Sequence, residues 1–357
     1  MNRLFYDKLV DIINRNPALS RHELFDLVNE DAFSLANGLA PLRYNLDSPK
    51  TTEKTIKHET FTSIYSNVKR KKMFKSSSNN SAAMNWRKLK ENALSLCAKY
   101  KEYEAEDYYG TKRNNIILRV AHELGVAPVL ICRLLLDGFI KMGCLELNPT
   151  FSNGASLVSA PNTPQTQTHA KISVSQLVKE THMLRNARLA AEVLECCALD
   201  DDYGPTVDLI KNLVGLEYEQ RLEHMLRSRG LTFTKEDELR EKGFDKTPDF
   251  KLELPIYLSN GVCVSWIDSK ATFGDEQSHA DYYENQFKYY LNRFGSGLVI
   301  YWFGYLADIE KINYSLFRNS NSATGNGTGA VNAASSIVIS HAFPKEFTML
   351  NVKSLLE

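Results

Sequence analysis

The sequence predicts an all-α region followed by an α/β domain built around a mixed central sheet. From residue 86 to residue 145 the apolar side chains recur at helical intervals. After Gly215 a helix and a short β-prone run precede the apolar runs "DFKLELPIYL" and "GVCVSWIDSK", and a helix over 282–293 precedes "GLVIYWFGYL" and "SIVISHAF". The order helix, three strands, helix, strand, strand is typical of a sheet sandwiched between helices.

Composition divides the chain into five segments. The predicted segments are a small helical segment (1–40), a polar linker or mostly disordered insertion (41–85), a helical domain (86–147), a low-complexity linker (148–172) and the α/β domain (173–357). Ser20 and Glu23 have the spacing of a capping box, which predicts a helix after Ser20. The run at 319–336 is rich in Ser, Asn, Gly and Thr, and predicts a disordered insertion within the α/β domain.

The predicted helical domain contains the spacing of a helix-turn-helix. Ala121 is the small residue, Gly125 the turn residue and Ile131 the buried aliphatic residue, and Pro128 suits the first turn of the second helix. That helix begins "PVLIC", without the basic and amide side chains of a DNA-reading helix, and Arg133 stands alone. A helical unit that packs against its neighbours or docks a protein is therefore favoured over a major-groove reader, and both interpretations stay open.

Charge and cysteine content exclude several classes of protein. Forty-three basic and 43 acidic side chains cancel, so a polyanion site has to be a local patch. The six cysteines show no Cys-x-x-Cys spacing, which indicates reduced thiols rather than a zinc site or a disulfide framework. The first residues lack the apolar core of a signal peptide, and no run reaches the roughly 20 apolar residues of a membrane span. We expect a soluble intracellular protein.

Charged residues interrupt two strand-like runs where packing alone favours Val or Ile. Alternation places Asp249, Lys251 and Glu253 on one face of the first run, and Asp268 and Lys270 on one face of the second. Converging carboxylates are hard oxygen ligands that suit Mg²⁺ or Mn²⁺, and a lysine beside the metal could position or deprotonate the attacking water. The alternative is a salt-bridged pair on a solvated strand face, although the second run is otherwise apolar and should be buried.

The register of these two strands presents a difficulty for a shared metal. If Asn260 and Gly261 formed a two-residue hairpin turn, Asp268 would face Glu253, and Asp249 would lie about 13 Å further along the strand. Either Pro255 breaks the ladder and the connection is longer, or Glu253 is a ligand.

Four motifs bear a family resemblance. Pro248-Asp249 followed by Asp268-x-Lys270, together with "DKTPDF", "WIDSKATFGDE", "NRFGSGLVIYWFG" and "YGPTVDLIK", resembles the TPD-motif branch of the PD-(D/E)xK nuclease superfamily over about residues 173–318. The resemblance implies a restriction-endonuclease-like α/β domain, with Asp249, Asp268 and the backbone carbonyl of Ser269 as metal ligands and Lys270 orienting water or stabilising charge. It also favours the break at Pro255.

The resemblance further implies an acid on the preceding helix and an accessory pair. With Leu222 on the buried face, Glu219 lies within about 60° of it, so we choose Glu219 over Glu217. Gln286 and Tyr290 resemble the accessory pair of some superfamily members, but an amphipathic helix with one inward tyrosine has the same pattern.

The resulting expectation is a Mg²⁺-dependent or Mn²⁺-dependent phosphodiesterase, a structure-selective DNA endonuclease. The alternative, also implied by the resemblance, is a nuclease-like fold that serves as the partner of a codanin-type protein with little turnover. A sequence-specific regulator, based on the helix-turn-helix alone, is the weakest option.

The cluster Lys69, Arg70, Lys71 and Lys72 predicts an import signal or a phosphate-contacting arm, or else a solvated charge run. We expect a nuclear and cytoplasmic protein.

Overall fold

The computed structural model describes residues 1–16, 19–30, 56–74, 81–108, 114–148, 155–158, 170–311 and 336–349. The chain forms two compact units, and one of them is discontinuous in sequence. The first combines Met1–Val68 with Leu213–Glu357, and the second is Lys69–Asn212. The predicted insertion at 319–336 lies, except for its last residue, outside the described residues.

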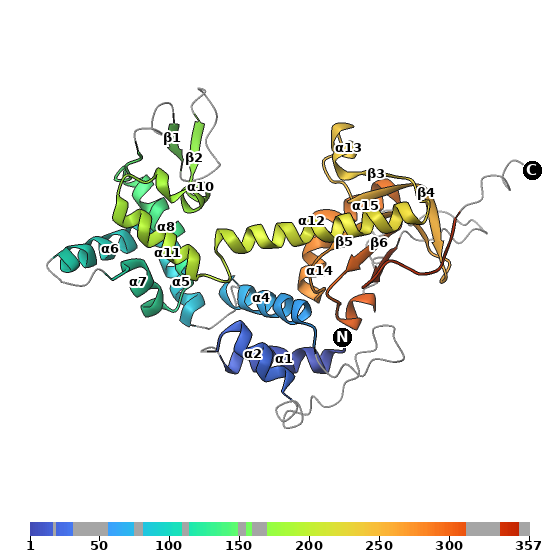
Figure 1. Ribbon diagram of the computed structural model, residues 1–357, viewed down its shortest axis with the longest axis horizontal. Helices are drawn as coiled ribbons and strands as arrows, with labels where there is room; N and C mark the ends of the chain where they lie inside the picture. The colour runs from blue at the N-terminus through green and yellow to red at the C-terminus, as the bar shows by residue number, and fades with distance from the viewer. Residues whose placement is uncertain are drawn as a thin grey trace, which may run out of the picture. The chain divides into compact units, whose positions relative to one another are not determined.

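A mixed sheet forms the centre of the first unit (Figure 1). Its strands are β3 (Phe233–Lys235), β4 (Phe250–Leu258), β5 (Cys263–Lys270), β6 (Gly297–Tyr301), β7 (Ile337–Ser340) and β8 (Phe347–Met349). They are ordered β3-β4-β5-β6-β7, with β8 also paired to β4. The pairs β5/β6 and β6/β7 are parallel, and the others are antiparallel. The predicted mixed sheet is confirmed, and β8 is an additional short strand.

Helices cover both faces of this sheet. The part of helix α12 (Pro205–Ser228) that begins at Leu213 lies along one face, where Leu222 and Leu226 pack on apolar residues of β4, β5 and β6 (Figure 1). Trp266 of β5 lies in the core on the other face. That core is covered by α14 (Glu276–Tyr282), the π-helix η2 (Tyr283–Phe287), α15 (Lys288–Phe294) and the short 3-10 helix η3 (Ala307–Lys311).

The N-terminal helices belong to the sheet-containing unit, which the sequence did not predict. Helices α1 (Arg3–Arg15) and α2 (Arg21–Asn29) join α4 (His58–Phe74) in the core beside Trp266. The predicted capping box of α2, between Ser20 and Glu23, is confirmed.

The linker predicted at 41–85 is wrong for residues 56–74 and for the start of α5 (Ser81–Glu91). The buried residues Phe61, Ile64, Tyr65 and Val68 recur at helical spacing within a segment whose average composition is polar. Residues 41–55 and 75–80 lie outside the described residues.

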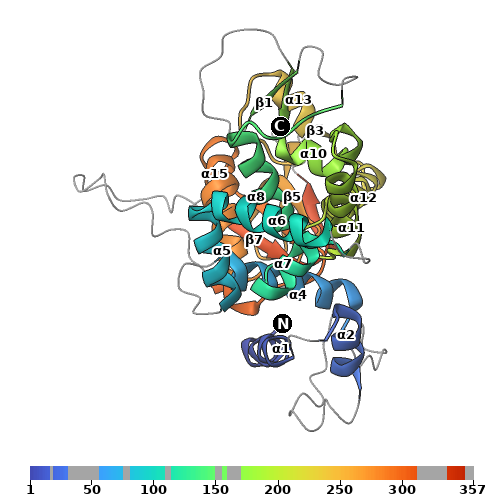
Figure 2. The same cartoon turned by 90° about the vertical axis from the view of Figure 1, so that its left-hand side faces the viewer.

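The second unit is helical and larger than predicted. Its remaining elements are α6 (Ala93–Tyr108), α7 (Ile116–Leu124), α8 (Pro128–Lys141), β1 (Ala155–Val158), β2 (Ala170–Ser173), α10 (Val174–Lys179), η1 (Thr181–Met183) and α11 (Ala187–Leu199). Helix α8 contacts α6, α7, α10 and α11, and the view of Figure 2 faces this unit. The predicted boundary at residue 173 is therefore wrong, because α10 and α11 complete the helical core. The parallel pair β1/β2 lies within the predicted linker at 148–172.

Helix α8 packs inside this unit. Its early residues Val129, Ile131 and Cys132 are at most 1% exposed, so they face the core and not a groove of DNA. Ala127 gives no side-chain cap, and the carboxylate of Asp200 accepts the Val129 amide at 3.0 Å in its place. The structure therefore agrees with the packing interpretation of this helix pair. Among the described helices none is long and apolar enough to cross a bilayer.

Candidate active site

Asp249 and Asp268 lie opposite each other because β4 contains a bulge. Near the turn, Tyr257 pairs with Cys263 and Ile256 with Val264, whereas beyond the bulge Lys251 pairs with Trp266. The break between Lys251 and Ile256 contains Pro255 and gives β4 three more residues than β5. The next strand pair is Phe250 with Ile267, so continuing the register by one residue sets Asp249 opposite Asp268. The predicted break of the ladder at Pro255 is confirmed.

Glu253, the alternative ligand, has other partners. It lies within the bulge, accepts a hydrogen bond from the Thr234 hydroxyl and forms an ion pair with Lys251 at 3.4 Å. Its side chain is 47% exposed. The structure therefore brings together Asp249 and Asp268, and not Glu253.

The site consists of a pair of acids with one lysine. Asp268 is 1% exposed, and its Oδ1 lies 2.5 Å from the Nζ of Lys270. Asp249 is half-buried, and its Oδ2 accepts the backbone amide of Ser269 at 2.6 Å. Two carboxylates and one ammonium leave this end of the sheet with excess negative charge.

A backbone carbonyl faces the same side as these acids. The amide and carbonyl of a strand residue point to the same neighbour, and the Ser269 amide donates to the Asp249 carboxylate, so the Ser269 carbonyl points toward β4 as well. The pairing of β4 with β5 ends at Phe250 and Ile267, and Asp249 lies in a bend just outside β4.

Burial and mutual repulsion set the protonation behaviour of the cluster. Burial raises the pKa of Asp249, and the nearby Asp268 raises it further. Burial likewise raises the pKa of Asp268, and the Lys270 ammonium only partly offsets this rise. Burial opposes the charged form of Lys270, but Asp268 and Asp249 outweigh that effect and raise its pKa. Lys270 therefore remains a cation at neutral pH.

The two candidate helix acids differ in burial. Glu219, on α12, is half-buried, and burial raises its pKa with further contributions from Glu236 and Asp268. Glu217 is exposed. A further acid near the cluster, Glu236, was not predicted from the sequence. It is the first residue of α13 (Glu236–Glu241), and its backbone amide donates to the Asp249 carbonyl at 3.2 Å. Only the three-dimensional fold brings it near the cluster.

Gln286 and Tyr290 lie at a helical irregularity. Gln286 belongs to the π-helix η2, and its Oε1 is buried without a hydrogen-bond partner in the structure. The Tyr290 ring packs edge-on against Trp266, with centroids 5.2 Å apart. Burial raises the pKa of Tyr290, and the charges of Asp268 and Asp249 raise it further. Single-turn π-helices are frequent at functional sites.

The oxygen donors at this site have the chemistry that suits a divalent cation. One buried and one half-buried carboxylate, a carbonyl and the nearby Glu219 are hard oxygen donors, and a cation would relieve their repulsion. Within the described part of the chain, however, no three His, Cys, Asp or Glu side chains form a ready-made metal cluster. In this arrangement the Lys270 ammonium forms an ion pair with Asp268.

The basic cluster belongs to the second unit. Lys69, Arg70, Lys71 and Lys72 occupy the later turns of α4, a helix, and not a disordered tract. Lys69 is half-buried, and burial lowers its pKa.

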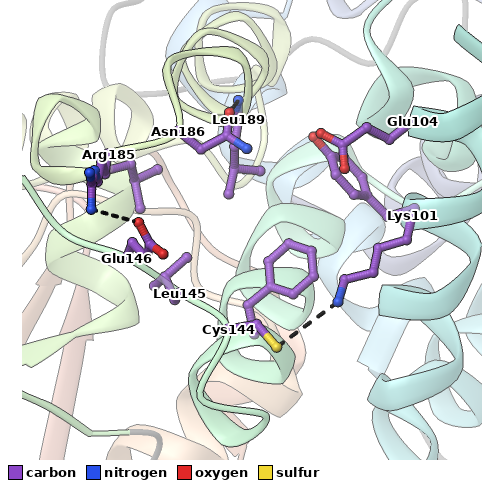
Figure 3. Close-up of a pocket in the computed structure, with 11 residues that line it drawn as sticks. Lys101, Glu104, Cys144, Leu145, Glu146, Arg185, Asn186 and Leu189 are labelled. Carbon is purple, nitrogen blue, oxygen red and sulfur yellow. Dashed lines mark hydrogen bonds and ion pairs between the residues drawn. The ribbon is translucent and has the colours of Figure 1, made fainter. Parts of the chain in front are cut away.

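A separate cavity of about 470 Å³ lies in the helical unit (Figure 3). Figure 3 shows the Lys101 amine directed at the Cys144 sulfur, 4.0 Å away, and the ion pair between Arg185 and Glu146 at 2.9 Å. None of the predicted site residues lines this cavity.

Comparisons with known proteins agree on one family. The family model described as "Protein of unknown function TPD sequence-motif" matches residues 185–320. The CDAN1-interacting nuclease 1 of Danio rerio is 39% identical over 195 residues, which are 55% of this chain and 58% of that protein. The proteins of the same name from Homo sapiens and Mus musculus are 37% and 36% identical over 222 residues, 60% of this chain and 71% of each relative.

The chain thus spans less than two thirds of the zebrafish relative and more than two thirds of the human and mouse relatives. No solved structure matches the chain. Identity at this level over this share of the human and mouse proteins shows that the chain belongs to the CDAN1-interacting nuclease 1 family.

Proposed function

We propose that the chain is a metal-dependent nuclease with a restriction-endonuclease-like domain that hydrolyses phosphodiester bonds in DNA, selecting the structure of its substrate. The observation that carries this proposal is the bulge of β4, which sets Asp249 opposite Asp268 and beside Lys270. The names of the relatives support nuclease chemistry.

The site residues have different proposed roles. Asp249, Asp268 and the Ser269 carbonyl would hold Mg²⁺ or Mn²⁺, which supplies an activated water and neutralises charge on the phosphate oxygens. The Lys270 ammonium, which pairs with Asp268, would orient the attacking water or stabilise negative charge on the phosphate. Glu219, whose pKa burial raises above its ordinary value, would accept a proton from water. Gln286 and Tyr290 position the phosphate.

A cleavage assay with matched variants tests this proposal. Labelled single-stranded, duplex, flap and four-way DNA are incubated with the protein in Mg²⁺ and in EDTA. Asp249→Asn should abolish Mg²⁺-dependent cleavage. Glu219→Gln should reduce it by about 100-fold or more, while Glu217→Gln on the same helix should leave it unchanged. Equal cleavage in EDTA, or full activity of Asp249→Asn, would contradict the proposal.

A second function, docking to a codanin-type protein, is suggested by the name of the relatives. It is separable from catalysis. Asp249→Asn should still co-purify with such a partner, since the substitution changes one carboxylate at the end of the sheet.

We also propose a nuclear and cytoplasmic location, with the basic cluster of α4 as its import signal. Replacing the four basic residues by alanine should lower nuclear abundance without changing cleavage.

A further inference from the structure

A group of aromatic side chains adjoins the acid and lysine cluster. Trp302 directly follows β6, and its backbone amide donates to the Lys270 carbonyl at 3.1 Å. Its indole Nε1 donates to the Ser269 hydroxyl at 2.8 Å. Ser269 lies between Asp268 and Lys270 in β5, so its side chain points to the opposite face of the strand, and these two hydrogen bonds fix the indole on the α12 face at the end of the sheet that carries the site.

Three more side chains complete this group on the α12 side of the sheet. The Tyr218 ring, one residue before Glu219, has its centroid 5.2 Å from that of Trp302 and 5.4 Å from that of Phe303. The guanidinium carbon of Arg221 lies 5.7 Å from the Trp302 ring and 5.8 Å from the Tyr218 ring. We call Tyr218, Arg221, Trp302 and Phe303 the aromatic platform.

The platform is open to solvent where a ligand could reach it. Tyr218, Trp302 and Phe303 are half-buried, and Arg221 is exposed. Gly304 has φ of 86°, a conformation that glycine adopts readily, and so allows the chain to turn directly after Phe303. A guanidinium beside the faces of aromatic rings is the combination with which proteins bind single-stranded nucleic acid, the rings taking a base and the cation a phosphate.

We propose that the aromatic platform stacks an unpaired base of the substrate on the α12 face, at the end of the sheet that carries the acids. A base inside a continuous duplex is covered on both faces by its neighbours, so the rings can take only a base that is single-stranded or has been extruded. The inference rests on the proposed nuclease function and narrows it. The substrate class is DNA with unpaired nucleotides, such as a single-stranded overhang or flap.

Binding measured in EDTA tests the platform without cleavage. The probe is fluorescein-labelled oligothymidine, either alone or paired with oligoadenine, and the measurement is fluorescence anisotropy. Tyr218→Leu should weaken single-strand binding about tenfold and change duplex binding by less than about twofold, because stacking contributes about 1–3 kcal/mol per base. Tyr218→Phe keeps the ring and should bind like the parent protein.

The matched control is Tyr257→Leu, which removes an exposed tyrosine near the C-terminal end of β4, away from the platform. It should leave both affinities unchanged. Intrinsic fluorescence gives an independent readout, since the chain has three tryptophans. Oligothymidine should quench the parent protein, and this quenching should disappear in Trp302→Phe, which retains Trp86 and Trp266.

The outcomes distinguish the two proposals. Unchanged single-strand affinity in Tyr218→Leu, an equal loss for duplex, or a parent protein that binds no single strand would overturn the platform. Full cleavage by Asp249→Asn would overturn the nuclease function instead. Thermal melts of each variant identify any loss that arises from unfolding. An inactive Asp249→Asn that binds oligothymidine like the parent protein, beside a weakened Tyr218→Leu, supports both.

Discussion

Asp249→Asn should make the metal-free protein more stable while removing its response to metal. Facing residues on antiparallel strands have Cα atoms about 5 Å apart, and unit charges at that distance repel by roughly 3 kcal/mol at an effective dielectric constant of 20. Attraction to Lys270 is of similar size, so the two Coulomb contributions of Asp249 nearly cancel. The cost of burying the charge remains, and asparagine keeps an oxygen to accept the Ser269 amide.

We therefore expect Asp249→Asn to raise stability at pH 7 by about 1–2 kcal/mol, or a melting temperature higher by about 2–6 °C. The gain has a defined pH dependence. Because the folded pKa of Asp249 is raised above its ordinary 3.8, ionisation disfavours the folded state as pH rises through the folded pKa. The gain should thus be largest at neutral pH and should vanish below pH 3.8.

Thermal melts with EDTA and with millimolar Mn²⁺ measure both effects. Metal at 100 times its dissociation constant should stabilise the parent protein by about 2.7 kcal/mol, and Asp249→Asn should lose most of this. Glu253→Gln is the control, because it removes an acid from the same strand outside the site and should keep the full metal response. A parent protein that ignores Mn²⁺, beside a destabilised Asp249→Asn, would refute the reasoning.

Three further substitutions test other contacts. Lys270→Met leaves Asp268 buried without its cation and should cost about 3 kcal/mol, measured by denaturant unfolding, as well as abolish cleavage. Burial lowers the pKa of His279 to about 4 from 6.5, so stability should fall by about 3 kcal/mol as the pH drops from 6.5 to 4, and His279→Gln should flatten this slope in melts across that range. Asp200→Ala removes the acceptor of the Val129 amide and should lower the stability of the helical unit by about 1–2 kcal/mol, with cleavage unchanged.

The sequence was sufficient to predict the strands of the central sheet except β8, and to single out the charged residues beside them, but it was insufficient to predict the bulge that aligns those residues. Alternating apolar and polar residues predicted β4, and a largely apolar run predicted β5. Asp249, Asp268 and Lys270 were singled out because they are charged residues within or beside these runs. The three extra residues of the bulge have no signature except Pro255, because the apolar alternation continues through them. Helical periodicity on α12 was the basis for choosing Glu219 over Glu217. No local sequence pattern predicts that Glu236 lies near Glu219 or that Trp302 packs on Tyr218, because these contacts form between segments distant in the sequence.

The N-terminal helices were missed for a related reason. The apolar stripe of α4 lies in a segment whose overall composition is polar, and its partner surface is more than 200 residues away, as the 3.0 Å hydrogen bond between the Ser63 and Thr272 hydroxyls shows. Composition averaged over a window reports solubility, whereas the spacing of Phe61, Ile64, Tyr65 and Val68 reports a buried face.

The discontinuous first unit has a consequence for synthesis on the ribosome. Its N-terminal helices emerge first, but the sheet on which they pack is complete only after the whole helical unit has been translated. At about 5–20 residues per second the apolar faces of α1 and α4 wait on the order of ten seconds or more for their partners. The helical unit can fold during that interval, while the N-terminal segment remains exposed to chaperones and to aggregation. Translation speed between residues 69 and 300 should therefore affect the yield of folded protein more than it affects the stability of the finished molecule.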